Sequence, residues 1–259
     1  MAVAIVVGAA RGIGAAVAVR LAEQGWDLAL GDVCEDDAEL AYPLGSSTEL
    51  EGVAVKCRNS GITVGVAKCD VRVLSEMEAL TAQARTLGEV HAVVYVAGVL
   101  GGSGLAWEVD DATFERDLDV NFRGLVNAAR ATVPTLLSNA PNSRFVAVLS
   151  ASSHSGLPLL SSYAASKHAA AGYLHSLAID LAAHGVTVNG VSPGSTDTRL
   201  LQATAAVYDL KNVSEFAEQQ RIGRLLDPAE IASAVSWLVS PEASGVTGSV
   251  VRVDGIFTG

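Results

Sequence analysis

Seven short apolar runs rich in β-branched residues recur along the chain, separated by longer segments of helical periodicity. The runs cover 3–8, 27–32, 63–70, 91–98, 144–150, 186–192 and 249–255, and the helical segments lie at roughly 12–24, 74–87, 111–138, 161–184 and 228–239. Strands that are apolar along their whole length are covered on both faces, as in a parallel sheet. The alternation is typical of a doubly wound sheet with right-handed crossovers. Because no linker divides the chain, we expect a single α/β domain over residues 1–259.

The composition and net charge indicate which kinds of binding partner the protein has. Half of the residues are hydrophobic and 17% are charged, which is enough for a large core. A formal net charge of −11 argues against nucleic acid or an anionic membrane as partner, since both attract basic patches. The apolar start of the chain has no basic residues before it and is too short to span a bilayer. We therefore expect a buried strand there and a cytoplasmic protein.

Cysteine and histidine usage gives no sign of a metal or disulfide framework. Cys34, Cys57 and Cys69 form no CxxC pair, which fits free thiols in a reducing compartment. The five histidines are scattered and form no HExxH pattern. We expect no metal site.

A glycine-rich turn lies between the first expected strand and the first expected helix. Gly8, Gly12 and Gly14 allow a tight turn and close approach of the backbone to a phosphate, while the helix start offers free N–H groups. The strand–turn–helix setting is the context that a phosphate-binding motif requires. We expect this loop, with Arg11 and Ile13, to bind the phosphates of a dinucleotide; tight packing alone is the alternative.

Asp32 ends the second expected strand. A carboxylate there can accept hydrogen bonds from both ribose hydroxyls of an adenosine, and it would repel a 2′-phosphate. The next residue is Val33 and not a base, although Arg11 could counter the repulsion. These residues favour NAD over NADP.

Other cofactor contacts and site walls follow from the same geometry. Asp70, with Val71 after it, ends the third expected strand and could bind the adenine amino group; capping the next helix is its alternative role. Residues 33–50 and roughly 195–222 do not fit the alternation, and both begin beyond strand ends, where ligands bind in such sheets. We expect the first to lie over the adenosine and the second to contact substrate; surface insertions are the alternative.

Tyr163 and Lys167 stand four residues apart in an expected helix, so their side chains can meet. A cation beside a phenol lowers the phenol's pKa from about 10 toward neutrality. Such a tyrosine can exchange a proton with an alcohol or a carbonyl. For the pair alone, an ordinary helix with an exposed lysine remains the alternative.

With these features together, the chain resembles the short-chain dehydrogenase/reductase family over essentially its whole length. "DVNFRG", a serine thirteen residues before Tyr163, and "VSPGSTDT" match that family in order. The resemblance implies a Rossmann fold with strand order 3-2-1-4-5-6-7 and a catalytic tetrad of Asn121, Ser150, Tyr163 and Lys167. In it, Tyr163 is the base, Ser150 binds the substrate oxygen, Lys167 also binds the nicotinamide ribose, and Asn121 positions a relay water.

The resemblance also implies cofactor contacts after the fourth and sixth strands, from Ala97, Gly98, Pro193, Gly194, Thr196 and Thr198. For the two threonines, simple turn chemistry is the alternative. The chain departs from the family at Val7, where a threonine is usual, and at Tyr95 and Val96, which replace two asparagines. The terminal "VDGIFTG" also lacks the common second glycine. These departures affect details of cofactor binding and not the tetrad.

A narrower resemblance lies in "DVCEDDAELAYPLGSSTEL" and "AGVLGGSGLAWE". Both are similar to segments of the mycofactocin-associated dehydrogenases of actinobacteria, which include carveol dehydrogenase-like enzymes. That resemblance implies a tightly held, non-exchanging NAD that mycofactocin, an external redox carrier, reoxidises. An ordered segment over the adenosine would slow escape of the cofactor.

The substrate is expected to be a lipophilic secondary alcohol or ketone. Apolar residues border the expected cleft, and an apolar pocket suits such a ligand: Leu157, Pro158, Leu159, Leu200, Leu201 and Val207. No Arg or Lys cluster offers a handle for a phosphate or a carrier protein. Ser152 is the alternative to Ser150, and His154 either contacts substrate or forms local hydrogen bonds.

The leading hypothesis is an NAD-dependent alcohol dehydrogenase or ketoreductase. One alternative is a conventional ketoreductase with exchangeable NAD(P), similar to 3-oxoacyl-carrier reductases. Another is a catalytically idle NAD(H)-binding redox sensor, which would have no reason to keep four tetrad residues. The apolar helices that carry Asn121 and Tyr163 favour packing between subunits, and the family resemblance implies a homotetramer.

Overall fold

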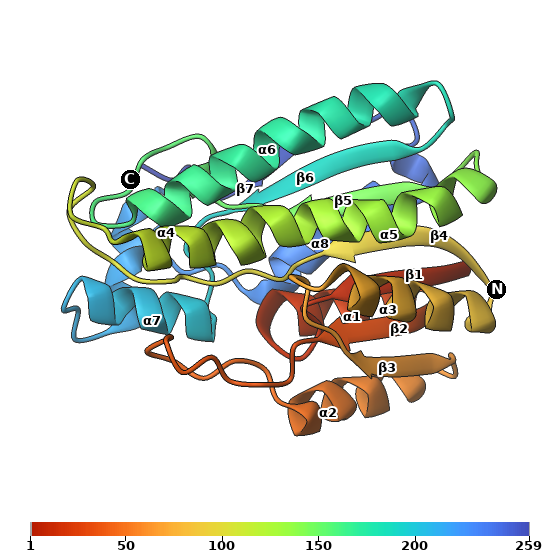
Figure 1. The fold of residues 1–259 in the computed structure, drawn as a ribbon, viewed down its shortest axis with the longest axis horizontal. Coiled ribbons are helices and arrows are strands. Elements are labelled where there is room, and N and C mark those ends of the chain that lie inside the picture. Colours follow the sequence, from red (N-terminus) through yellow and green to blue (C-terminus); the bar gives the residue numbers. More distant parts are fainter. Residues whose placement is uncertain (1, 259) are drawn as a thin grey trace.

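The strands form one parallel sheet in the order β3-β2-β1-β4-β5-β6-β7 in the computed structural model, which describes residues 2–258 (Figure 1). This confirms the expected seven-stranded doubly wound sheet. The first two strands along the chain are adjacent, with Ala4 opposite Leu28 in register. The strands are β1 (Ala2–Val7), β2 (Asp27–Asp32), β3 (Val64–Lys68), β4 (Glu89–Tyr95), β5 (Arg144–Val148), β6 (Thr187–Pro193) and β7 (Val250–Val253).

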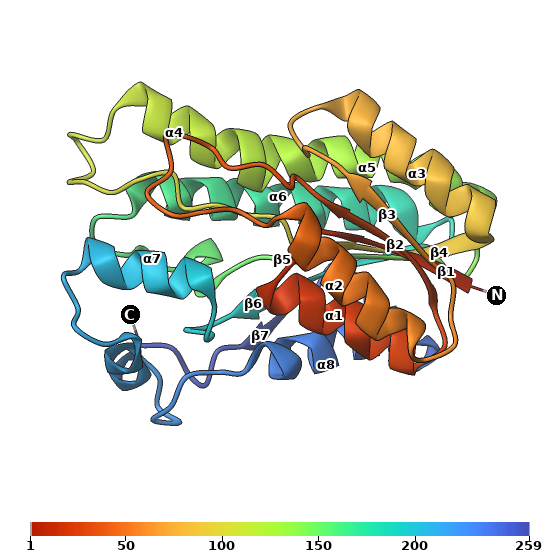
Figure 2. The same ribbon diagram turned by 90° about the horizontal axis from the view of Figure 1, so that it is seen from below.

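Helices cover both faces of the sheet. One face carries α1, α2 and α8, and the other carries α3, α5 and α6, with α4 beside them (Figure 2). The helices are α1 (Gly12–Glu23), α2 (Ser47–Arg58), α3 (Leu74–Leu87), α4 (Asp111–Leu118), α5 (Gly124–Ser138), α6 (Ser161–Ala182), α7 (Arg199–Val207) and α8 (Pro228–Val239). Strands buried on both faces explain the continuous apolar runs of the sequence.

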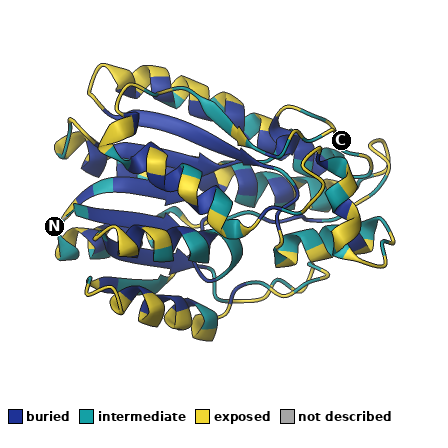
Figure 3. Ribbon diagram, turned by 180° about the vertical axis from the view of Figure 1, so that it is seen from behind, coloured by how far each residue is buried: buried dark blue, intermediate teal, exposed yellow. Residues whose placement is uncertain are grey.

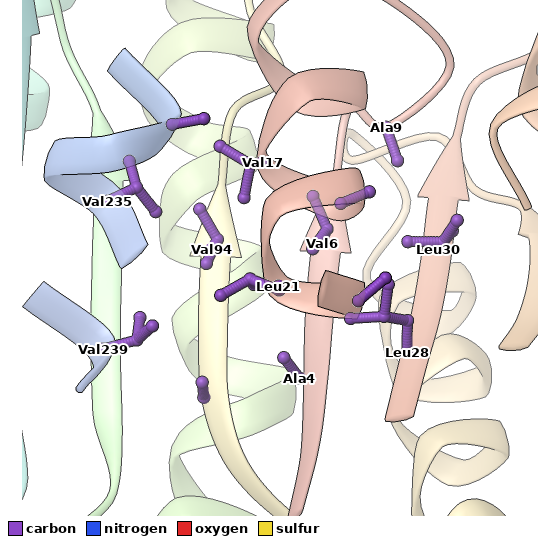
Figure 4. Packing of buried hydrophobic residues seen from close by; sticks show 14 of the residues in the cluster. Ala4, Val6, Ala9, Val17, Leu21, Leu28, Leu30, Val94, Val235 and Val239 are labelled. Carbon is purple, nitrogen blue, oxygen red and sulfur yellow. The ribbon is translucent and has the colours of Figure 1, made fainter. Parts of the chain in front are cut away.

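The side chains of each strand contribute to two hydrophobic cores, one on each face of the sheet, because successive side chains point to opposite faces. In β1, Ala4 and Val6 pack with α1 and α8, as Figure 4 shows, whereas Val3 and Ile5 pack on the other side. The strands are accordingly buried while the outer faces of the helices are exposed (Figure 3). The two cores hold rigidly the strand ends from which the loops depart.

Three segments differ in detail from the expected pattern. Helix α2 begins inside the stretch 33–50, at a capping box in which Ser46 and Glu49 bond each other's backbone N–H groups. The expected helix 111–138 is interrupted by a π-helical turn, Asp119–Arg123, between α4 and α5. The stretch 195–222 contains α7 and a 3₁₀ turn, Val213–Gln219.

No helix among residues 2–258 is long and apolar enough to cross a membrane. No group of three or more His, Cys, Asp or Glu side chains in the same range is arranged to hold a metal ion.

Candidate active site

The glycine loop after β1 packs so closely that side chains could not be accommodated. A Cβ on Gly14 would lie 1.8 Å from the carbonyl oxygen of Gly8, and one on Gly8, whose φ is +84°, would lie 2.6 Å from the Ala97 nitrogen. Helix α1 then starts after Arg11, whose side chain does not cap it. The first N–H groups of α1 are therefore free to bind an anion.

Asp32 is buried at the carboxyl end of β2. Its Oδ2 accepts the N–H of Ala10 at 2.9 Å, which fixes the carboxylate beside the glycine loop. Burial raises the pKa of Asp32, although the backbone hydrogen bonds to it act in the opposite direction. A Cβ on Gly45 would come within 2.7 Å of Oδ1, so the segment after β2 passes directly over this side chain.

A cavity of about 510 Å³ lies over these groups, at the carboxyl ends of the central strands. This volume is in the usual range for a cofactor site. Twelve of the residues predicted to bind the cofactor line it: Gly8, Arg11, Gly12, Ile13, Gly14, Asp32, Val33, Asp70, Val71, Ala97, Gly98 and Thr198.

Asp70 does not cap the following helix, so that alternative is wrong. Helix α3 starts after Val73 without a side-chain cap. The Asp70 carboxylate instead accepts hydrogen bonds from the Arg72 side chain, at 2.9 Å from Nε and 2.7 Å from Nη2. Burial acts to raise the pKa of Asp70, but the hydrogen bonds from Arg72 outweigh it and lower that pKa. Asp70 thus faces the cavity as a carboxylate.

Residues 33–46, which we call the flap, form one wall of this cavity through Leu40, Tyr42 and Leu44. The Tyr42 hydroxyl accepts the N–H of Leu100 at 2.8 Å, which joins the flap to the loop after β4. The Arg11 guanidinium donates to the carbonyl oxygen of Pro43. Its Nη1 is buried without a hydrogen-bond partner among residues 2–258.

Ion pairs join the flap and the start of α2 to three other parts of the cleft. Each exposed pair contributes little alone, about 0–1 kcal/mol, but their combined effect is to hold one arrangement. The pairs are Arg72–Asp37 at 3.5 Å, Arg116–Glu39 at 3.8 Å and Arg199–Glu49 at 3.1 Å. Sequence reasoning placed this segment over the adenosine but missed its anchors, because their partners are distant in the chain.

A second cavity, of about 160 Å³, adjoins the first. Ile13, Val96, Gly98, Thr198 and Leu200 line both cavities. The second cavity is also lined by predicted site residues from the loop after β5, from α6 and from the end of β6 with the turn that follows it: Ser150, Tyr163, Lys167, Pro193, Gly194 and Thr196. Every predicted site residue except Asn121 thus lines one cavity or the other.

Tyr163 and Lys167 lie one turn apart on α6. Lys167 Nζ is 5.7 Å from the centre of the Tyr163 ring and 3.5 Å from the carbonyl oxygen of Val148. The lysine side chain is buried. A Cβ on Gly98, which lines both cavities, would lie 3.2 Å from Nζ, so a side chain there would crowd the ammonium.

The pKa values of this pair differ from the sequence-based expectation. Burial raises the pKa of Tyr163 to about 12, with a hydrogen bond to Ser150 acting against it and Asp117 adding to it. Burial lowers the pKa of Lys167 to about 8, and the Asp117 carboxylate counters part of that shift. Desolvation is thus the largest influence on the phenol, whose pKa is not brought toward neutrality.

Ser150 is the serine that faces Tyr163. Its Oγ accepts the N–H of Ser152 at 3.1 Å and lies 3.1 Å from the Ser152 hydroxyl, which is fully buried. Ser152 therefore supports Ser150. His154 is exposed and is not among the residues that line either cavity, which favours its local role.

Asn121 lies fully buried on the π-helical turn between α4 and α5. Its side chain accepts the Val99 N–H at 2.8 Å and donates to the Val99 carbonyl at 2.9 Å and to Ser166 Oγ at 3.0 Å. It thereby fixes the chain after β4. Tyr95, where the family has an asparagine, donates its hydroxyl to the Val120 carbonyl at 2.6 Å and supports the same turn.

The outer wall of the second cavity is mostly apolar. Leu157, Leu200 and Leu201 line it as expected, whereas Pro158, Leu159 and Val207 are not among the lining residues. Sequence reasoning missed further lining residues that come from distant segments: Leu100, Leu160, Tyr208, Phe216 and Phe257. Nothing in the local sequence around Phe216 or Phe257 marks them.

Comparison with known proteins agrees with this geometry. The profile of a family described as "Enoyl-(Acyl carrier protein) reductase" matches residues 8–258. A (−)-trans-carveol dehydrogenase of Rhodococcus erythropolis is 33% identical, covering 97% of this chain and 95% of its own. A 3-oxoacyl-(acyl-carrier-protein) reductase of Aggregatibacter actinomycetemcomitans is 31% identical, covering 97% of each.

The fold agrees as well. The crystal structure of a carveol dehydrogenase from Mycobacterium avium in complex with NAD superposes with a TM-score of 0.93 at 28% identity, covering 98% of this chain and 96% of the other. The fold, the glycine loop, and the serine, tyrosine and lysine around one cavity all lead to one conclusion. The chain belongs to the short-chain dehydrogenase/reductase family of oxidoreductases.

Proposed function

We propose that this protein is an NAD-dependent dehydrogenase that transfers hydride between a lipophilic secondary alcohol or its ketone and NAD. One observation carries the proposal. The cavity that fits a dinucleotide adjoins a smaller apolar cavity, and Ser150, Tyr163 and Lys167 line the smaller one beside the residues that both share. The likeness to carveol dehydrogenases, one of them solved with NAD, supports it.

NAD is favoured over NADP by the groups around Asp32. The carboxylate is held beside the glycine loop by the Ala10 N–H, and it can accept the adenosine ribose hydroxyls. Arg11, the one base of the glycine loop, already donates to Pro43 of the flap. A 2′-phosphate would therefore meet a fixed negative charge.

The residues of the second cavity divide the chemistry between them. Bound NAD supplies the hydride acceptor, and its oxidised ring carries a positive charge. Tyr163 removes the hydroxyl proton of the alcohol, and Ser150 donates a hydrogen bond that stabilises charge on the same oxygen. Lys167, as an ammonium, stabilises the phenolate and binds the nicotinamide ribose. Asn121 holds the loop after β4 through Val99. Its expected role in positioning a relay water stays a prediction.

We further propose that NAD stays bound between turnovers. The flap lines the cofactor cavity and is joined to the loop after β4 through Tyr42 and to α4 through Glu39 and Arg116. Release of a dinucleotide from beneath it would require these contacts to break. A cofactor held in this way needs an external acceptor, for which mycofactocin is the candidate.

The residues that line the second cavity favour a substrate without an anionic group. Among the described residues that line the second cavity, Lys167 is the only lysine and there is no arginine. Leu157, Leu201 and Phe216 offer apolar surface instead. These features favour a lipophilic alcohol over an acyl-carrier substrate. The homotetramer and the cytoplasmic location remain predictions.

The test is the absorbance of the purified protein near 340 nm, before and after addition of a panel of secondary alcohols. The proposal expects reduction of bound cofactor without added NAD. Reduction only when NAD is added would support a conventional dehydrogenase with an exchangeable cofactor. No reduction by any alcohol, with or without added NAD, would favour the redox-sensor alternative.

A further inference from the structure

Asp117, near the end of α4, is a fully buried carboxylate to which the sequence-based mechanism gives no role. Its Oδ1 accepts the N–H of Gly101 at 2.7 Å, and its Oδ2 accepts the hydroxyl of Ser162 at 2.7 Å. A buried carboxylate is costly unless it is paired or well hydrogen-bonded. Two short bonds from opposite sides hold this one in a single position.

The two donors connect Asp117 to the reacting groups. Ser162 immediately precedes Tyr163 on α6, and Gly101 follows Leu100, which lines the second cavity. The carboxylate thus bridges the helix that carries Tyr163 and Lys167 to the loop at the cavity edge.

The charges facing Asp117 come from three elements. From α6 they are Lys167 and Tyr163, and from the flap it is Tyr42. Arg116, its neighbour on α4, is directed elsewhere, since it donates to the Gly101 carbonyl at 3.2 Å and pairs with Glu39 at 3.8 Å. The cations that act on the Asp117 carboxylate are Lys167 and Arg116, and of these two only Lys167 lines the second cavity.

We propose that Asp117 is a positioning residue whose negative charge keeps Lys167 protonated and sets the pH at which Tyr163 accepts a proton from substrate. This rests on the proposed dehydrogenase function. A fixed charge in a poorly solvated site acts over several ångströms, since the effective dielectric constant there is well below that of water. Burial alone favours a neutral lysine, and the carboxylate opposes that effect.

The sign of the effect follows directly. An anion nearby makes both Lys167 and Tyr163 harder to deprotonate, so its removal lowers both titration midpoints. Alcohol oxidation requires the phenolate, so its rate rises with pH through the coupled titration of the pair. Without the anion, that rise occurs at lower pH.

The first test is Asp117→Asn, which keeps the shape, can accept the Gly101 N–H and can donate to Ser162. We expect the rising limb of the pH profile of alcohol oxidation to move down by about one pH unit. Asp180→Asn is the matched control, because it removes the same charge from an exposed site on α6, roughly 25 Å along the helix from Tyr163. That variant should leave the profile in place.

The second test needs no turnover. With lysine labelled by ¹³C at Cε, Lys167 can be followed by NMR, since the chain has only three other lysines: Lys56, Lys68 and Lys211. The Lys167 midpoint should lie near 8 in the wild type and move lower in Asp117→Asn. An unchanged midpoint would show that Asp117 is neutral or too distant, and would overturn the proposal.

The outcomes separate this proposal from the proposed function. If the wild type oxidises no alcohol, the dehydrogenase function fails, while the Lys167 midpoint still tests Asp117. If Asp117→Asn does not fold, Asp117→Ser replaces it: this variant also removes the negative charge, so the Lys167 midpoint should again move lower. No movement in that variant also overturns the proposal.

Discussion

The two halves of the cleft are built from different chemistry. Around the cofactor cavity, backbone N–H groups, buried carboxylates and ion pairs fix the walls, and the flap is joined to three separate elements. Around the substrate cavity, leucines and aromatic rings make up most of the outer wall. Hydrogen bonds and ion pairs have fixed directions, so they favour one specific ligand with a long residence time. Apolar contacts have no preferred direction and accommodate ligands of different shapes.

This difference supports the proposed division of labour, in which the nucleotide half retains one cofactor and the substrate half exchanges lipophilic ligands. Tyr163 and Lys167 line the substrate cavity beside Gly98, which lines both cavities, and in the proposed mechanism they serve both halves. Variants in each half should therefore have separable effects, and the following predictions test that separation.

The largest effect is expected at the boundary. Tyr163→Phe removes the acid–base hydroxyl and should lower the rate of alcohol oxidation by about 10²–10⁴-fold. Binding of NAD, followed by fluorescence titration, should change little because the ring and its packing remain. A variant that keeps a tenth or more of wild-type turnover would contradict the assignment of Tyr163.

The next effect belongs to the nucleotide half. Asp32→Asn loses a charged acceptor for the ribose hydroxyls, and such hydrogen bonds contribute about 1.5–3 kcal/mol, or about 10–100-fold in Kd for NAD. The ratio of NAD to NADP affinity should fall because the repulsion of a 2′-phosphate is removed. Calorimetry with each cofactor measures both. An unchanged ratio would show that Asp32 does not discriminate.

A matched pair of Tyr→Phe variants compares the two halves directly. Tyr42→Phe removes the acceptor of the Leu100 N–H and should speed NAD release by about tenfold, the effect of one such bond. Tyr208→Phe removes a hydroxyl that donates to the Pro158 carbonyl at 2.7 Å at the substrate end. It should alter KM for alcohols and leave NAD release unchanged. Equal effects of the two on NAD release would contradict the division.

The smallest effect is expected from trimming the apolar wall. Leu201→Ala should raise KM for a lipophilic alcohol roughly fivefold, which corresponds to about 1 kcal/mol of lost apolar contact. The turnover number should stay close to wild type, since the reacting groups are untouched. Steady-state kinetics with alcohols of increasing size measures it. A collapse in turnover would mean that Leu201 orients the substrate as well as contacting it.

The sequence predicted what local pattern determines. The apolar runs predicted all seven strands, because strands buried on both faces must be apolar throughout. The cofactor-binding roles of the glycine loop and Asp32 were predicted from the pattern of a strand, a glycine-rich turn and a helix, with Asp32 at the end of the next strand. The anchors of the flap and residues such as Phe257 could not be predicted, because they depend on how distant segments meet. The pKa of Tyr163 was expected in the wrong direction, because burial is a property of the fold and not of the i, i+4 spacing.

Retention of the cofactor during turnover tests the central claim most directly. The protein is loaded with isotopically labelled NAD, desalted, and supplied with a secondary alcohol, an artificial electron acceptor and excess unlabelled NAD. The account predicts that the label stays on the protein through many turnovers while alcohol is consumed. Loss of label at a rate matching turnover would contradict it.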